Sequence, residues 1–142
     1  MEHDAVEPPD PRLGFDPGDL DDIPGTTIFT MARSRQAYWL HRFCMSLMKV
    51  ENRTAFKADE SAYLDRFRMT IDQKEGVMDR DFNRLIGLGG NIYFLVKIAS
   101  TDGWSVQKAV GTMTGMTADA YGAMMIAGGR SPEGNRSIRE KR

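Results

Sequence analysis

The chain has 142 residues, of which 41% are hydrophobic and 27% are charged, and its formal net charge is −1. These values are typical of a single globular domain and do not favour a disordered, fibrous or nucleic-acid-binding chain. Cys44 is the only cysteine and the only histidines are His3 and His41, so neither an internal disulfide nor a site built from several thiols or imidazoles is expected.

No segment of the sequence predicts a membrane span or an export signal. The apolar run at residues 92–96 ends at Lys97, far short of the ~20 residues that a membrane helix needs. The first residues are acidic, whereas a signal peptide begins with basic residues. Together with the single free cysteine, these features predict a cytoplasmic protein.

Charge and proline content divide the chain into three parts. Residues 1–24 contain eight acids, one base and five of the six prolines, and this composition predicts an extended acidic arm. Residues 25–129 lack proline and are expected to form the folded domain. Residues 130–142 contain five bases and two acids with few apolar groups, which predicts a second, basic arm.

The middle part of the sequence has the periodicity of amphipathic helices. Apolar side chains recur every fourth residue at Trp39, Phe43 and Leu47, with His41 on the opposite, mostly polar arc. The expected fold is all-α with about five to seven helices. The five that the pattern defines best cover residues 39–48, 59–67, 70–87, 92–99 and 117–127. Residues 26–29 are the one place where the sequence also permits a short strand.

Several residues mark the helix ends. Thr70 followed by Gln73 is a capping box, in which each side chain accepts a hydrogen bond from the other residue's backbone amide. Asn91 and Thr117 are expected to cap the next two of these helices. Glycines near residues 87–90 and 128–129 provide left-handed ends.

No group of residues in the folded part predicts a catalytic site of its own. His41 has no carboxylate or nucleophile three or four positions away, so a solvated or hydrogen-bonded histidine is the preferred interpretation. Cys44 lies on the apolar stripe and is expected to pack in the core. Asp79 and Asp81 are two residues apart on the expected helix and therefore do not face each other.

Three other features of the sequence bear on binding. The glycines of residues 87–90 follow a helix rather than a strand and lack the Lys-Ser/Thr ending of a phosphate loop. The arginines of the C-terminal arm have no interleaved aromatic residues, so nucleic-acid binding is not expected. The nine methionines after Met1 are either core filler, which is slightly preferred, or adaptable contact residues for a partner.

Seven short stretches resemble, in the same order, the small alpha subunit of protocatechuate 4,5-dioxygenase, the LigA family. They are residues 21–26 (DDIPGT), 45–53 (MSLMKVENR), 56–64 (FKADESAYL), 89–95 (GGNIYFL), 100–103 (STDG), 113–117 (MTGMT) and 128–132 (GGRSP). Each stretch is short, but seven in register indicate membership of the family. The resemblance runs from about residue 21 to residue 138.

The resemblance implies catalysis by a partner chain. In this family a large beta subunit holds a non-haem Fe(II) on two histidines and a glutamate, and opens the ring of a catecholic acid with O2 beside the two hydroxyls. The alpha subunit is a helical cap over that site in an α2β2 assembly. No catalytic residue and no metal ligand is therefore expected in this chain, which agrees with its two histidines.

The residues that the resemblance places at the substrate-pocket lid are Thr101, Trp104, Ser105 and Val106. The family often has an aromatic residue where this chain has Val106, and Trp104 is a neighbouring bulky side chain. The substrate therefore stays open among protocatechuate, gallate and a methoxylated relative. Two alternatives to a dioxygenase subunit are a stand-alone helical interaction module of the same fold and, more remotely, an autonomous enzyme.

Overall fold

The computed structural model describes residues 20–131 and 138–139 of the chain. These residues form nine α-helices and no strand, so the all-α prediction is confirmed. The helices are α1 (Met31–Gln36), α2 (Tyr38–Ser46), α3 (Val50–Ala58), α4 (Glu60–Leu64), α5 (Ile71–Met78), α6 (Phe82–Gly87), α7 (Ile92–Thr101), α8 (Val106–Thr114) and α9 (Ala118–Ile126). Within the described residues, no helix has the length and apolar character needed to cross a bilayer.

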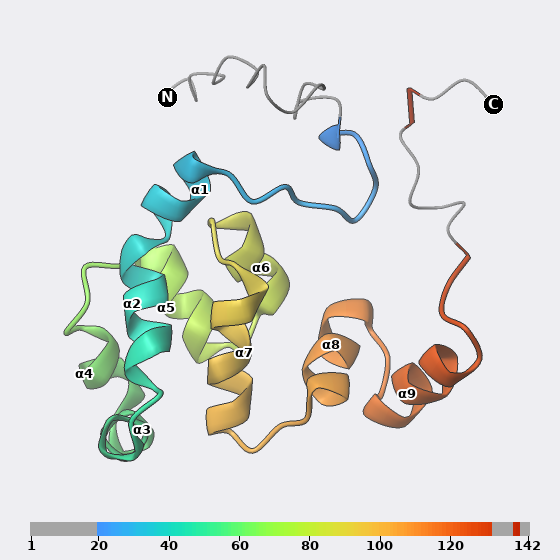
Figure 1. Cartoon of the computed structure of the whole chain (residues 1–142). Coiled ribbons are helices and arrows are strands. Elements are labelled where there is room, and N and C mark those ends of the chain that lie inside the picture. The colour runs from blue at the N-terminus through green and yellow to red at the C-terminus, as the bar shows by residue number, and fades with distance from the viewer. Residues whose placement is uncertain (1–19, 132–137, 140–142) are drawn as a thin grey trace.

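The core lies where α2, α5, α6 and α7 meet, and α2 packs against α7 (Figure 1). A cluster of aromatic rings joins α2 to α3 and α4, with the Phe43 ring 5.2 Å from that of Phe56 and 6.0 Å from that of Tyr63. Both phenylalanine side chains are fully buried, and each contributes about 1.5–3 kcal/mol through burial. α8 and α9 pack together at the side of the bundle away from α3 and α4 (Figure 1).

The helix count differs from the predicted five to seven for two reasons. First, α1, α3 and α8 are short helices that were not predicted from the sequence. Second, the single helix expected over residues 70–87 is two helices, because Arg80 has a positive φ of 52° between them. The Asp81 side chain accepts a hydrogen bond from the Arg84 amide at 3.1 Å and so caps a new helix, α6.

The structure contains the predicted capping box, but it has no strand where the sequence permits one. The capping box at Thr70 and Gln73 is formed with both hydrogen bonds, at 3.1 and 3.0 Å, and so is confirmed. Residues 26–29 form no strand. Gly89, with φ 98°, helps to end α6, and its Cα lies so close to the Arg33 carbonyl that a Cβ would stand 2.9 Å from that oxygen. Gly89 thus serves the end of the helix and a close backbone approach.

The two predicted arms lie largely outside the described residues. The described ends of these arms meet, because the Arg139 guanidinium contacts the carboxylates of Asp21 at 2.9 Å and Asp22 at 3.2 Å. The Arg139 amide also donates to Asp22 at 2.9 Å. A basic residue of the C-terminal arm is thereby paired with two acids of the N-terminal arm.

Candidate functional site

The four residues of the predicted lid lie along one short segment that joins α7 to α8. Val106 is the first residue of α8, and 63% of its surface is exposed. Ser105 caps that helix, since its hydroxyl accepts a hydrogen bond from the Lys108 amide at 3.1 Å. Thr101 is only 4% exposed and its hydroxyl donates to the Lys97 carbonyl at 2.8 Å, so it stabilises the end of α7 and does not face outward.

Trp104 differs from Val106 because its ring is turned towards the protein. The ring contacts Phe82 edge-to-face at a centroid distance of 6.4 Å, and the Lys108 ammonium lies 4.5 Å from the ring centre on another side. The Trp104 amide donates to the Ala99 carbonyl at 3.0 Å. Trp104 therefore anchors the loop, and Val106 is the apolar side chain that the loop presents to its surroundings.

A partly buried cation, Arg80, supports this loop. The Arg80 side chain is only 15% exposed and donates to both carboxylate oxygens of Asp102, at 2.6 and 3.1 Å. It also donates to Glu60 at 2.7 Å, and its guanidinium lies 5.4 Å from the centre of the Phe56 ring. Burial by itself lowers the pKa of Arg80, but the hydrogen bonds and charges of Asp102 and Glu60 outweigh it and raise that pKa.

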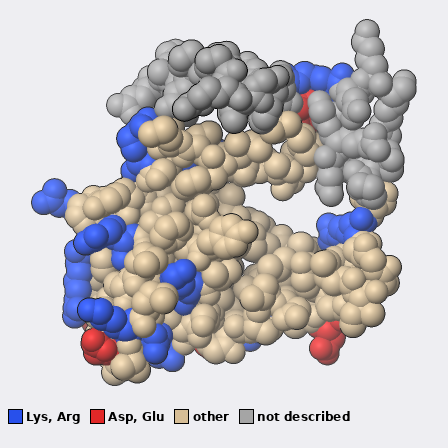
Figure 2. Space-filling view, in the orientation of Figure 1, with Lys and Arg blue, Asp and Glu red and all other residues tan. Residues whose placement is uncertain are grey.

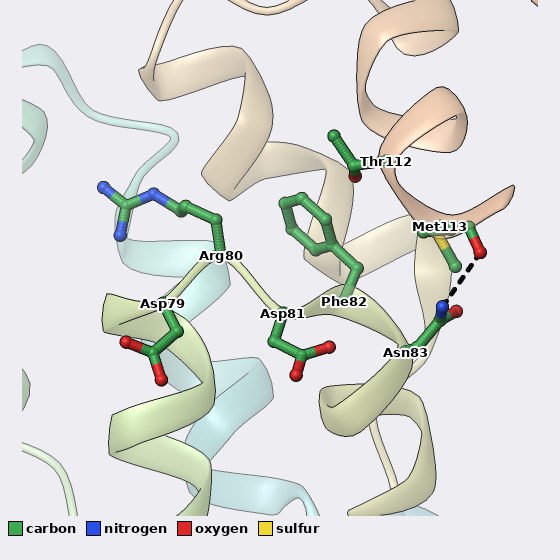
Figure 3. Close-up of a pocket in the computed structure, with 7 residues that line it drawn as sticks. All are labelled: Asp79, Arg80, Asp81, Phe82, Asn83, Thr112 and Met113. Carbon is green, nitrogen blue, oxygen red and sulfur yellow. Dashed lines mark hydrogen bonds between the residues drawn. The ribbon is translucent and has the colours of Figure 1, made fainter. Parts of the chain in front are cut away.

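The turn that carries Arg80 also borders a shallow hollow of about 300 Å³ between α6 and α8 (Figure 3). Across it, the Asn83 amide group donates to the Met113 carbonyl at 2.9 Å, which ties α6 to the end of α8. The carboxylates at its edge do not form an acid pair, because Asp81 caps α6 and Asp79 lies 4.0 Å from the Arg84 guanidinium. Asn83 and Asp81 at the hollow therefore serve helix packing and capping.

Other titratable groups in the fold are used for packing. His41 is buried, stacks on Phe94 at 4.4 Å and accepts a hydrogen bond from the Asn91 amide at 2.9 Å, and burial lowers its pKa. The hydrogen-bonded alternative for His41 is confirmed, whereas the solvated alternative is wrong because the start of α7 covers the side chain. Cys44 is fully buried as predicted, and burial raises its pKa to about 12.

Among the described residues, no three His, Cys, Asp or Glu side chains come together in a way that could hold a metal ion. The residues that the structure describes thus do not fit an iron site.

A sparsely charged and partly apolar surface lies next to the loop, over α8 and α9. Between Ser105 and Gly129 only Lys108 and Asp119 are charged. α9 has no buried residue, and Met125 and Ile126 are 53% and 91% exposed. Figure 2 shows this surface as mostly uncharged, whereas Lys and Arg gather along the side where α2, α3 and α4 lie.

The methionines contribute to the exposed apolar surface more than to the core. None of the nine described methionines is buried, and Met45, Met48 and Met125 are each about half or more exposed. The slight preference for core filler was therefore wrong for most of them. Flexible, polarisable side chains at a surface suit an interface with another protein.

Sequence reasoning missed Arg80 and the turn around it. An arginine between two aspartates reads as a solvated stretch, and its partners Glu60 and Asp102 are 20 and 22 residues away. The Asp81 cap was the one local signal that could have indicated a break in the helix.

Fold and surface together define a class of protein: a small helical domain whose described residues present a sparsely charged, partly apolar surface over α8 and α9, beside the exposed Val106. The family comparison agrees with this class. A family model described as the LigA subunit of the aromatic-ring-opening dioxygenase LigAB matches residues 40–126, from α2 to the end of α9. The chain therefore belongs to the LigA subunit family of aromatic-ring-opening dioxygenases, as the resemblance of its motifs indicated. A subunit of this family implies a second chain as its partner.

Proposed function

We propose that this chain is the non-catalytic alpha subunit of a cytoplasmic extradiol dioxygenase of the protocatechuate 4,5-dioxygenase type. In this proposal the large beta subunit holds the Fe(II), binds a catecholic acid and O2, and pairs with this chain in an α2β2 assembly. The loop of residues 104–106 covers the mouth of the beta-subunit site. Family membership and the poor fit of the described residues to a metal both support the assignment of the iron to the large subunit.

The observation that carries the proposal is the exposure of Val106 beside a sparsely charged surface. An apolar side chain at the first residue of a helix, 63% exposed, gains stability only if another surface covers it. The adjacent α8 and α9 provide a docking face with few charges, so little desolvation of charged groups would oppose that contact. A cover of this kind would exclude water from reactive species formed during ring opening.

Val106 is the residue that we assign to the substrate side of this cover. Trp104 is held against Phe82 within the chain, so it does not take the place of the aromatic residue that the family often has at Val106. A valine there leaves more room over the bound ring than an aromatic residue would. This geometry favours a catecholic acid with an additional substituent, such as gallate or a methoxylated relative.

Reconstitution with the large subunit tests the proposal. The isolated chain is expected to bind no stoichiometric iron and to cleave no catechol, whereas its addition to the large subunit with ferrous iron should raise ring-opening activity. Iron content and ring opening are measured for each protein alone and for the mixture. Iron-dependent activity of the isolated chain would show an autonomous enzyme instead.

The same experiment distinguishes a dioxygenase subunit from a stand-alone interaction module. If the chain neither associates with the large subunit nor changes its activity, the module is the better interpretation. Association should appear as co-elution at a mass larger than that of either chain.

A further inference from the structure

Arg80 has a backbone conformation that its residue type disfavours. Its φ of 52° is the only positive value among the described residues other than glycine. In this region Cβ crowds the backbone, so a residue stays there only where its other contacts outweigh the strain. Such positions are concentrated at functional parts of proteins. The contacts of Arg80 therefore indicate what this conformation serves.

Those contacts converge on the loop that carries Val106. The guanidinium forms a two-pronged contact with Asp102, the residue that ends α7, at 2.6 and 3.1 Å. Two residues after Arg80, the Phe82 ring contacts Trp104 at 6.4 Å. The turn thus holds the loop at two points, both within four residues of Val106.

The opposite side of the guanidinium is fixed to the body of the protein. It donates to Glu60 on α4 at 2.7 Å and to the Val77 carbonyl at the end of α5 at 2.7 Å, over the face of Phe56 on α3. One side chain therefore joins the loop to α3, α4 and α5. A planar guanidinium can make all of these hydrogen bonds at once, whereas a lysine ammonium cannot form the two-pronged contact.

On the basis of the proposed function, we propose that Arg80 is a positioning residue for the lid, which sets the place of Val106 over the substrate of the large subunit through Asp102 and Trp104. It touches neither the substrate nor the iron in this arrangement. Its removal lets the loop shift while the docking face on α8 and α9 stays intact. Small displacements of a side chain that faces a bound ring change selectivity more than they change association.

The test compares Arg80→Lys with Arg84→Lys, a control that also replaces an arginine paired with two carboxylates. Arg84 lies on α6 and contacts Asp72 and Glu75 at 3.1 Å, but no residue of the loop. Both variants are assayed as full chains in complex with the large subunit, with protocatechuate and gallate. Arg80→Lys should change the ratio of kcat/KM between these substrates by about 10-fold, whereas Arg84→Lys should leave it unchanged.

A second readout uses the isolated chain. In a Trp39→Phe background, Trp104 is the only tryptophan, and its fluorescence quenching by acrylamide reports how firmly the loop is held. Arg80→Lys should increase this quenching, and Arg84→Lys should not. If Arg80→Lys does not fold, Asp102→Asn loosens the same contact from the loop side and takes its place.

The outcomes are distinct. If Arg80→Lys lowers only the melting temperature, with substrate ratio and quenching like those of Arg84→Lys, Arg80 is a structural clamp and the proposal is wrong. If the unmodified chain does not stimulate the large subunit at all, the proposed function fails. The quenching comparison then decides by itself whether Arg80 holds the loop in place.

Discussion

Val106 and Val50 allow a matched comparison at the scale of single residues. Each is the first residue of its helix, and each is 63% exposed. Val106→Phe should change the kcat/KM ratio between protocatechuate and bulkier catechols by about 10- to 200-fold in the reconstituted enzyme, because it adds bulk over the bound ring. Val50→Phe should leave that ratio unchanged. Both variants should keep the melting temperature of the isolated chain, since neither side chain is buried.

Val106→Asp gives the complementary result. A carboxylate at this position would approach an apolar mouth and repel the carboxylate of the substrate, so kcat/KM should fall for all catecholic acids. Equal activity for the aspartate variant, with normal association, would place Val106 outside the substrate site. Activity with two substrates and melting temperature decide between these results.

His41 should make the stability of the isolated chain depend on pH. Burial lowers its pKa from the usual 6.5, and the Asn91 amide requires a neutral ring nitrogen as its acceptor. Below pH 6.5 the unfolded chain takes up this proton more readily than the folded chain, so the free energy of unfolding should fall as the pH falls. The limit for one group is about 1.4 kcal/mol per pH unit.

The variant His41→Gln isolates this effect. Glutamine keeps an acceptor oxygen but does not titrate. The free energy of unfolding of the variant should therefore change less between pH 7.5 and 5.5 than that of the unmodified chain. Urea denaturation at several pH values measures both proteins. Parallel curves for the two would contradict a role of His41 in the pH dependence.

The burial of Cys44 could be predicted from the sequence, whereas the burial of His41 could not. Cys44 lies on the apolar stripe of α2, and periodicity alone correctly predicted its burial. His41 lies on the opposite arc of the same helix, but Phe94 and Asn91 of the distant α7 region cover it. A helical pattern reports which face is apolar, and it contains no information on a second element that covers the polar face.

At the scale of elements, α9 is notable because, like α1, it has no buried residue. Ile126, at its last position, is 91% exposed. Ile126→Ser should change the free energy of unfolding of the isolated chain by less than about 0.5 kcal/mol. It should weaken association with the large subunit by about 10-fold, since an apolar side chain at an interface contributes about 1–2 kcal/mol.

Ile71→Ser is the control for this prediction. Ile71 is the first residue of α5 and is 76% exposed, on another part of the bundle. Equal effects of the two substitutions on association would argue against α9 as the docking helix. Titration calorimetry with the large subunit measures both.

Helix starts were more predictable than helix breaks. Thr70, Asn91 and Thr117 were predicted as caps, and each side chain accepts a hydrogen bond from an amide in the first turn of its helix. The break at Arg80 was not predicted because ion pairs with Glu60 and Asp102 stabilise it. A helix cap depends on about four neighbouring residues, so the sequence shows it directly. Arg80, Glu60 and Asp102 are far apart in the sequence, and only folding brings them together.

At the scale of the whole molecule, the arms give a further prediction. Deleting residues 131–142 removes Arg139 and its contacts with Asp21 and Asp22. Exposed ion pairs contribute about 0–1 kcal/mol each, so the free energy of unfolding should fall only slightly. Association with the large subunit should weaken more, because the arm is too polar to stabilise a core of its own.

Deleting residues 1–20 should act in the same direction. Thermal unfolding of each truncated chain and its titration with the large subunit provide the measurement. A large loss of melting temperature without a change in association would show that the arms belong to the folded core.

The sequence by itself determined the all-α fold, several helix starts, the burial of Cys44 and the family, because these depend on local periodicity, capping and ordered motifs. Only the tertiary structure decided that Thr101 is buried, that Trp104 turns inward and that Val106 stays exposed. It also placed Arg80 against Asp102 across 22 residues of sequence. Which side chains face outward from a loop depends on the elements packed behind it, and that packing is a property of the whole fold.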